Sequence, residues 1–486
     1  MTKAKIFYHD IGDYLSREEK LAIIKKNRSV ANMQWQTLTP NEHGDWLNPR
    51  NDLFSEFIPL APEKKFDVKT KSFFIPYSLG IATNKDAWLY NFSEIKLAEN
   101  LETMISFYNE QRQKFHSQHT TKNAKDFVEY NAQKINWTDL FLNDLEKNIE
   151  YKLDKEKFCN VQYRPFMKQK FCYEKRLLQR TYQQTTIFPT INSKNLVICV
   201  SGIGVTKDFS TIISDTLPDL ELIGKSQCFP LYYYEDNKKQ EIYNLFDSSN
   251  ENQYTRRDAI SDFILERAKK QYGKNVTKED IFYYVYGFLH SPQYRETFAS
   301  DLKKMLPRLP LVEDVRDFWA FSKAGKKLAL LHLNYELGIT NYELRDGVID
   351  YSQPEKVEYG MAAEESKIPY YTPKDYKLFE VEKMRFPKKE QQDTIIYNSQ
   401  ITIKNIPLVA YQYVVNGKSA IEWIMERYQI TTHKESGIVN NPNDWALEAR
   451  KPRYILDVLL NVIHLSVETV EIVQSLPEVK FEETPN

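Results

Sequence analysis

The sequence predicts a mixed α/β protein of several domains, in which a helix-rich C-terminal part carries short mixed sheets. Two observations lead to this class. Amphipathic segments that open with helix-capping residues recur along the chain, and short apolar runs lie between them. The length of 486 residues is enough for roughly two to four domains of ~100–200 residues each. An apolar fraction of 42% and an aromatic fraction of 14% can fill sizeable cores.

Three helices are predicted from a capping box, in which the cap and the third helical residue exchange hydrogen bonds. The pairs with this spacing are Ser16 with Glu19, Thr277 with Asp280, and Ser419 with Glu422. Helices are expected to dominate from Thr255 to about Met305, where Pro292 and Pro307 end two apolar runs.

Buried helical faces follow from the apolar spacing. Phe282, Val285, Phe288 and Leu289 fall on one face of the helix after Thr277, so we expect them in the core. The segment Ile455–Val473 is apolar on most faces in its first half, which predicts a buried helix. His290 and His332 lie in helical runs, and packing or surface roles are favoured over metal ligation.

Strands are predicted in four places. They are Ser72–Thr83, Asn195–Gly202, Phe229–Glu235, and a two-stranded element over Thr394–Ile403 with Asn398 and Ser399 in its turn.

A polar stretch without large apolar residues, His116–Asp126, predicts a domain boundary. The resulting division is 1–115, a linker at 116–126, a large domain at 127–480, and a short acidic tail at 481–486 that is expected to fray. A long surface loop inside one domain is the alternative interpretation of the same stretch.

The bulk composition excludes several classes. A net charge of −1 argues against a general basic coating surface for nucleic acid. Four cysteines without a CxxC pair predict reduced thiols in the cytoplasm and no zinc site. The first residues contain no apolar signal segment, and the apolar stretch Tyr454–Leu465 is too short and too polar to span a bilayer.

Motifs for cofactor and phosphate binding are weak or missing. The cluster Ser201–Thr206 lacks the third glycine of a dinucleotide loop, so a tight turn is favoured. Gly224-Lys225-Ser226 and Gly417-Lys418-Ser419 lack the upstream glycine of a P-loop, so chance is the better explanation of both. The Gly-rich turn and the Pro-Pro-aromatic motif of an amino-methyltransferase are not found in the sequence.

One long stretch, Ile281–Val312 followed by Asp317–Glu336, resembles the C-terminal specificity region of Type ISP restriction–modification enzymes. Further family-like stretches cover most of the chain in the same order: Ile6–Ile24, Gly80–Ser93, Tyr163–Gln183, Asn195–Glu235, Ala410–Ile430, Ser436–Glu448 and Pro452–Ile463. None of them is a catalytic motif, so the specificity of the resemblance lies in their order and extent.

The resemblance implies sequence-specific recognition of double-stranded DNA. In that family one chain carries a nuclease, a helicase-like ATPase, an adenine methyltransferase and a target-recognition domain. Residues 1–115 would then be a distal methyltransferase-like region and 127–480 the target-recognition domain. Its role would be to position a target adenine for methylation and to license restriction. Only five residues precede Ile6, so we expect an excised fragment or a gene for the recognition half alone.

The family enzyme implies S-adenosylmethionine, ATP and Mg²⁺, but we expect this chain alone to bind none of them and not to be an enzyme by itself. The methyltransferase and helicase–nuclease portion would come from the full-length chain or a partner subunit. Two alternatives stay open: a subunit of a split adenine methyltransferase, and a protein-interaction module of a defence complex that does not bind DNA. A gene neighbour with the missing motifs would favour the former, and a salt-sensitive, sequence-selective gel shift would count against the latter.

The main DNA-contact candidates form a basic run. Tyrosine and phenylalanine are interleaved with Arg164, Lys168, Lys170, Lys175, Arg176 and Arg180, against the single acid Glu174. Lysine and arginine neutralise phosphates, and arginine also reads guanine. A solvated basic face is the alternative.

A second candidate is the segment with Asn440, Asn441 and Asn443, because asparagine pairs with adenine. Asparagine turns ahead of a helix explain it equally well. Lys225, Lys418 and Arg453 complete the set.

Overall fold

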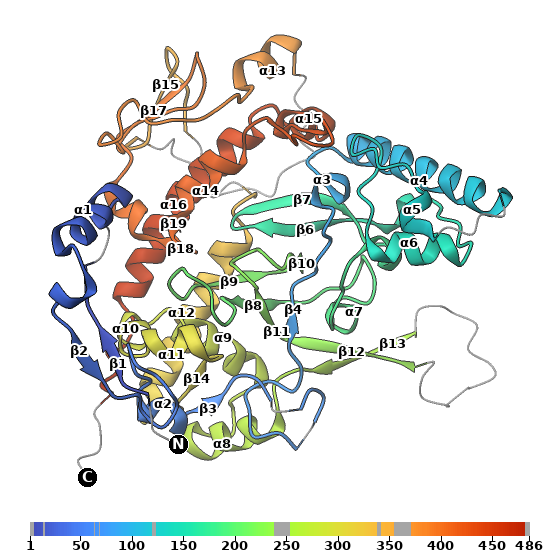
Figure 1. The fold of residues 1–486 in the computed structure, drawn as a ribbon. Coiled ribbons are helices and arrows are strands. Elements are labelled where there is room, and N and C mark those ends of the chain that lie inside the picture. Colours follow the sequence, from blue (N-terminus) through green and yellow to red (C-terminus); the bar gives the residue numbers. More distant parts are fainter. Residues whose placement is uncertain are drawn as a thin grey trace. The chain divides into compact units, whose positions relative to one another are not determined.

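The computed structural model describes residues 4–12, 15–62, 64–67, 69–118, 123–237, 253–337, 342–353 and 371–481 (Figure 1). The chain divides into two compact units, Met1–Glu56 and Phe57–Asn486. The mixed α/β class with short sheets is confirmed.

The first unit is small and has little core. Strands β1 (Ile6–Tyr8) and β2 (Gln36–Leu38) pair antiparallel, and α1 (Arg17–Asn27), the short η1 (Val30–Asn32) and α2 (Asp52–Glu56) complete it. The capping box predicted at Ser16 and Glu19 is present at the start of α1. No residue of α1 is buried within this unit's described part.

Two four-stranded sheets form the centre of the second unit. One has the order β10 (Leu217–Pro218), β6 (Phe158–Arg164), β7 (Met167–Cys172), β5 (Tyr90–Asn91). The other has the order β4 (Ser78–Leu79), β11 (Gln227–Pro230), β8 (Val197–Val200), β9 (Thr211–Ser214). All four residues of β8 and of β9 are buried, and those of β8 are all apolar, as is usual in a fully buried strand.

Smaller strand pairs surround these sheets: β3 (Ile58–Pro59) with β14 (Arg308–Leu309), β12 (Tyr232–Asp236) with β13 (Tyr254–Asp258), β15 (Val348–Asp350) and β16 (Ile395–Ile396) on either side of β17 (Thr402–Lys404), β18 (Val414–Val415) with β19 (Lys418–Ser419), and β20 (Thr431–Thr432) with β21 (Val439–Asn440). The hairpin predicted over Thr394–Ile403 is therefore confirmed as β16 and β17.

The helices of the second unit are α3 (Asp86–Leu89), α4 (Glu94–Ser117), α5 (Ala124–Phe127), α6 (Asp139–Glu146), α7 (Gln184–Ile187), α8 (Asp262–Tyr272), α9 (Lys278–Phe288), α10 (Pro292–Thr297), α11 (Ala299–Lys304), α12 (Val315–Leu333), α13 (Pro373–Phe379), α14 (Ala420–Arg427), α15 (Pro442–Glu448) and α16 (Tyr454–Gln474), with the short turns η2 (Lys155–Lys157), η3 (Lys175–Leu177) and η6 (Leu408–Gln412). The capping boxes predicted at Thr277 and Ser419 open α9 and α14. The predicted burial of the final helix is confirmed, because most residues of α16 are enclosed.

Helices α9 and α12 pack closely against each other (Figure 1). A Cβ atom at Gly325 would overlap the carbonyl oxygen of Tyr283 and lie 2.7 Å from the Gly287 nitrogen. A Cβ atom at Gly287 would overlap the carbonyl oxygen of Phe321. The two backbones therefore meet where neither helix carries a side chain.

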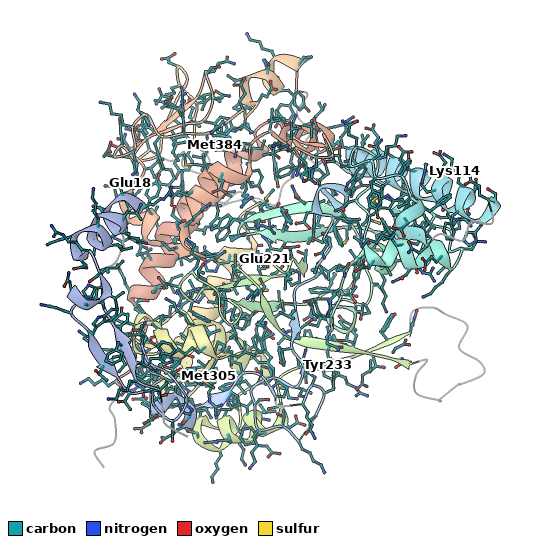
Figure 2. The ribbon with its side chains drawn as sticks, in the orientation of Figure 1. Glu18, Lys114, Glu221, Tyr233, Met305 and Met384 are labelled. Carbon is teal, nitrogen blue, oxygen red and sulfur yellow. The ribbon has the colours of Figure 1, made fainter. Side chains whose placement is uncertain are left out.

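Side chains fill the interior around this helix pair (Figure 2). The predicted core face of α9 is confirmed, since Phe282, Val285, Phe288 and Leu289 are all 0% exposed. His290 and His332 are also buried, and the Tyr286 hydroxyl and His332 Nδ1 lie 2.6 Å apart.

Two strand predictions were wrong in extent. Within Ser72–Thr83 only β4 forms, with isolated bridges at Phe74, Ile81 and Ala82. Pro76 has no N–H for a ladder, and Gly80 lies against the Asp219 backbone, which interrupts regular pairing. The run Phe229–Glu235 is split between β11 and β12 at Leu231.

The predicted helical region from Thr255 to Met305 begins later than expected. Residues Tyr254–Asp258 form β13, which pairs along its length with the tyrosine-rich β12, and the first helix starts at Asp262. Pairing with β12, which lies outside the segment predicted to be helical, therefore makes Tyr254–Asp258 a strand.

The predicted boundary His116–Asp126 lies within the second unit, and its middle, 119–122, is outside the described residues. On its two sides the rings of Phe115 and Phe127 pack edge to face. The domain bounds stay a prediction. The tail was expected to fray, but its first residue, Phe481, packs 4.9 Å from the ring of Phe298; the rest of the tail lies outside the described residues.

Candidate functional site

The β6–β7 hairpin carries the start of the predicted basic run, and its register with β5 separates two faces. Directly paired residues lie on the same face of a sheet. Val161 pairs with Gln169 and Tyr90 with Phe171, which makes one face mainly aromatic and apolar. On the other face Asn91, Asn160 and Gln162 pair with Lys170 or Lys168.

The lysines on the polar face have acidic partners. Lys168 Nζ lies 3.2 Å from Asp215 and 3.4 Å from Glu336, and Lys170 Nζ lies 3.2 Å from Glu94. Burial lowers the pKa of Lys168, but the carboxylates of Glu336 and Asp215 outweigh burial, so its pKa stays above the ordinary value. These cations are neutralised within the protein rather than solvated.

Arg164 belongs to a buried network at the end of β6. Its Nη1 lies 2.7 Å from Asp219, which also accepts a hydrogen bond of 2.8 Å from the Tyr90 hydroxyl. Asp86 accepts a hydrogen bond from the Tyr163 hydroxyl at 3.0 Å and lies 3.8 Å from Arg164. This network fixes α3, β6 and β10 relative to one another.

The asparagine segment contacts the residue after β5, the strand next to the hairpin, although the two are far apart in sequence. The Phe92 N–H donates to Asn440 Oδ1 at 2.9 Å, across 348 residues. Lys170 also lies 4.6 Å from the centroid of the Trp445 ring in α15. The two candidate groups chosen from the sequence are therefore brought together.

The side chains of the other two asparagines have structural partners. Asn441 caps α15 by accepting from the Asn443 N–H at 3.0 Å. Asn443 binds both backbone groups of Val381, at 2.9 and 2.8 Å. The turn interpretation of this segment thus describes Asn441 in this structure. Contacts of these asparagines with DNA stay a prediction.

The remaining candidates lie elsewhere. Arg176 and Arg180 are exposed after the hairpin. Arg453 lies at the start of α16, 3.3 Å from Asp457, and donates a hydrogen bond to the carbonyl of Tyr342. Lys418 forms an ion pair with Glu426 and lies 5.0 Å from the centroid of the Trp423 ring.

The glycine–lysine motifs of the sequence converge in space. The Gly202 backbone lies against the Lys225 carbonyl, and the Asn416 N–H donates to Ser210 Oγ at 2.8 Å. A Cβ atom at Gly417 would lie 2.9 Å from Cδ of Lys207. We call the segments 201–208, 224–226 and 416–418 the glycine–lysine turns. They bring together Lys225, Lys418 and Lys207, and the last of these was missed because no motif marks it.

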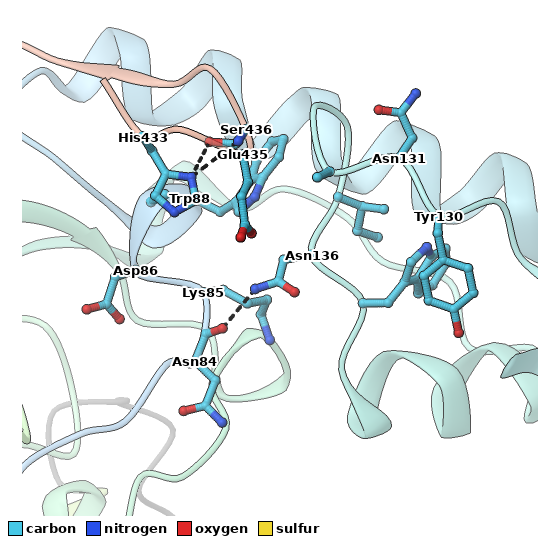
Figure 3. A pocket seen from close by; sticks show the side chains of 14 residues that line it. Asn84, Lys85, Asp86, Trp88, Tyr130, Asn131, Asn136, His433, Glu435 and Ser436 are labelled. Atoms are coloured by element: carbon cyan, nitrogen blue, oxygen red, sulfur yellow. Dashed lines mark hydrogen bonds between the residues drawn. The ribbon is translucent and has the colours of Figure 1, made fainter. Parts of the chain in front are cut away.

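Two adjoining cavities meet at the start of α3, and the second of them lies on the aromatic side of the hairpin. The first, of about 360 Å³, is the tryptophan pocket (Figure 3); its lining residues are Asn84, Lys85, Asp86, Ala87, Trp88, Tyr130, Asn131, Ala132, Ile135, Asn136, Trp137, His433, Glu435 and Ser436. The second, of about 370 Å³, is the tyrosine pocket, lined by Asp86, Ala87, Tyr90, Phe92, Tyr163, Met167, Gln169, Glu426, Arg427, Gln429, Thr431, Thr432, His433, Ile438 and Asn440. Asp86, Ala87 and His433 line both, so the pockets are neighbours.

Unpartnered polar groups lie beside both pockets. Lys85 is 2% exposed, its Nζ makes no hydrogen bond among the described residues, and it lies 4.3 Å from the centroid of the Phe141 ring. Burial lowers the pKa of Lys85 to about 8. Gln169 is 2% exposed, and neither amide atom has a described partner. No local signal in the sequence predicts either pocket, because their walls come from distant segments.

Possible metal ligands come together once in the described ranges, at Glu42, His43 and Asp52 of the first unit. All three are exposed, and exposed acidic groups are common without an ion, so we assign no metal site. Within the described ranges each helix falls short of the length or apolarity that a bilayer crossing requires.

The comparison with protein families is decisive for identity. The model of the Type ISP C-terminal specificity domain matches residues 72–458. The chain belongs to this family. No curated protein matches the sequence.

Solved structures resemble this Type ISP specificity domain along almost its whole length. A nuclease-deletion mutant of the Type ISP restriction–modification enzyme LlaGI, in complex with a DNA substrate mimic, is 36% identical over 99% of this chain, with a TM-score of 0.79. The ATP-dependent Type ISP enzyme LlaBIII bound to DNA is 35% identical over 99%, with a TM-score of 0.78. A DrdV–DNA complex is 27% identical over 98%, with a TM-score of 0.76. The chain spans 40%, 28% and 44% of these three proteins.

Proposed function

We propose that this chain is the sequence-specific double-stranded DNA recognition module of a Type ISP restriction–modification system. The observation that carries the proposal is the family match over residues 72–458, together with relatives that are DNA complexes and align with 98–99% of the chain. Such a module would act in the cytoplasm. It would position a target adenine for methylation and license restriction.

The chemistry would be supplied by other parts of the enzyme. S-adenosylmethionine, ATP and Mg²⁺ would serve the methyltransferase and helicase–nuclease portion, in the full-length chain or in a partner subunit. Purified chain incubated with S-adenosylmethionine and duplex DNA should therefore transfer no methyl group. Transfer of labelled methyl would instead favour the split methyltransferase.

We propose that phosphate contacts come from exposed cations rather than from the paired ones. The glycine–lysine turns present Lys207 and Lys225 at the surface, whereas Lys418 of the same turns is half-buried and paired with Glu426. Arg176 and Arg180 are also exposed. Arg164, Lys168, Lys170 and Arg453 already have acidic partners and, with Asn440, Asn441 and Asn443, would position the binding surface.

The salt dependence of binding tests this assignment. After a target is selected from a random duplex pool, anisotropy titrations between 50 and 200 mM salt compare wild type with a Lys207→Ala/Lys225→Ala double variant. Each lost phosphate contact lowers the log–log slope by about 0.9, so the double variant should lose up to about 2.

A Lys388→Ala/Lys389→Ala variant is the control, because these lysines are exposed and outside the turns. An unchanged slope in the first variant, or equal losses in both, would contradict the assignment. If wild type binds no duplex selectively, the recognition proposal itself is wrong and the interaction module is favoured.

A further inference from the structure

The tyrosine pocket combines aromatic walls with room for a small planar molecule. Tyr90 and Phe92 are buried in its wall, and the rings of Tyr90 and Tyr163 have centroids 4.4 Å apart. Its volume of about 370 Å³ lies within the range of ligand sites in proteins, roughly 300–1,000 Å³.

The polar groups at this pocket include two that lack partners. Gln169 shares a sheet face with Tyr90 and with the strand residue Val161, so its side chain lies on the pocket side of the hairpin. Its buried amide offers one acceptor and one donor group, and neither makes a described hydrogen bond. Arg427 also lines the pocket, and its Nε is a buried donor without a described partner.

A comparison within the same hairpin shows that the sheet can satisfy a buried glutamine. Gln162 is 3% exposed, and its amide donates to the Arg164 carbonyl at 2.9 Å and to the Met167 carbonyl at 3.4 Å. Gln162 lies on the opposite face and lines neither the tryptophan pocket nor the tyrosine pocket. The missing hydrogen bonds of Gln169 are therefore a feature of the face that lines the pocket, since the same hairpin provides partners for Gln162 on its other face.

The charges around the pocket point to a neutral occupant. Asp86 is bound by the Tyr163 hydroxyl, and Glu426 is paired with Lys418 and Arg427. The one cationic side chain in the lining that has an unused donor is thus already paired with a carboxylate. The carboxylates of Asp86 and Glu426 would repel a phosphate, but they would not repel an uncharged heterocycle.

We propose that the tyrosine pocket receives a nucleobase, with its faces against the aromatic wall and its edge on the Gln169 amide. Glutamine pairs with the adjacent amino group and ring nitrogen of adenine, so adenine is the expected base. Enzymes that extrude a base read its Watson–Crick edge by hydrogen bonds and stack its faces between aromatic side chains. The proposal rests on DNA recognition when the base comes from a bound duplex; a free nucleoside has the same chemistry.

The first experiment places 2-aminopurine at each adenine of the selected duplex and measures its fluorescence on binding. One position should brighten several-fold with wild type, because the base leaves the stack. Gln169→Leu should abolish that increase while its melting temperature stays at or above that of wild type. Gln162→Leu, whose side chain lies away from the pocket, should retain the fluorescence increase at a temperature where it is folded.

The second experiment measures adenosine binding to the DNA-free chain by ligand-observed NMR. Binding by wild type that Gln169→Leu reduces at least tenfold would identify a free nucleoside as an occupant. If neither a duplex position nor adenosine gives a signal that depends on Gln169, the pocket does not receive a nucleobase. If wild type binds no duplex, the DNA-recognition proposal is wrong. The adenosine measurement would still show whether the tyrosine pocket binds a nucleobase.

Discussion

Replacing Gly325 by alanine should destabilise the protein through the contact between α9 and α12. An added methyl group would overlap the Tyr283 carbonyl oxygen and lie 2.7 Å from the Gly287 nitrogen, and both atoms are backbone. Overpacking of this kind costs up to about 3 kcal/mol. Alanine favours a helix interior over glycine by about 1 kcal/mol. We therefore expect a net loss of about 2 kcal/mol.

The same contact predicts non-additivity. Gly287→Ala meets the Phe321 carbonyl oxygen on the other side of the crossing, so either substitution alone forces the helices apart. Once they are separated, the second substitution should cost less, and the double variant should be more stable than the sum of the single losses predicts. Urea unfolding followed by circular dichroism measures all three variants.

An exposed position on the same helix provides the control. Lys327 lies on the outer side of α12, so Lys327→Ala should change the free energy of unfolding by no more than about 0.5 kcal/mol. A Gly325→Ala variant as stable as wild type would show that the helices can separate without loss. Strictly additive losses would show that the two glycines do not act at one contact.

Three further predictions concern buried side chains, each measured by chemical or thermal unfolding. Phe288→Ala should cost about 3–5 kcal/mol, because the ring is 0% exposed and leaves a cavity; a variant with unchanged stability would show that the site collapses. Gln162→Leu should be destabilising because it removes two hydrogen bonds, while Gln169→Leu should be neutral or stabilising by about 1–3 kcal/mol because it removes an unpartnered amide; the reverse order would contradict this assignment. Lys85→Met should stabilise the protein at pH 7 by at most about 3 kcal/mol, because burial disfavours the charged form of Lys85 and lowers its pKa from 10.5 to about 8. Because the unfolded state binds more protons between those values, wild type should regain this deficit as pH rises from about 8 to 10.5; a gap that does not depend on pH would refute it.

Local signals in the sequence were sufficient for the helices that carry their own caps. Ser16, Thr277 and Ser419 each open a helix, because the capping hydrogen bonds span only three residues. Strand extent was less predictable. Residues Tyr254–Asp258 become a strand because β12 lies beside them, and a local sequence window contains no trace of that partner.

The candidate site shows the same limit. Their charge marks Arg164 and Lys168 as candidates in the sequence, but their partners Asp219, Asp215 and Glu336 come from distant segments. Pairing of this kind is a property of the fold, so the sequence left open whether the cations were solvated. Asn441 was the opposite case, since a cap one residue before Pro442 is a local signal.

The hydrogen bond between Phe92 and Asn440 has a consequence for synthesis of the chain on the ribosome. Strand β5 lies at the edge of its sheet. Asn440, which binds the residue after β5, is translated 348 residues later than Phe92. At about 5–20 residues per second, Asn440 emerges roughly 20–70 s after β5. Once β7 has been made and has paired with β5, the edge at Tyr90 and Phe92 stays open to other strands until residue 440 is made. Nascent chains should therefore be most prone to aggregation, and most dependent on chaperones, before residue 440 has been made.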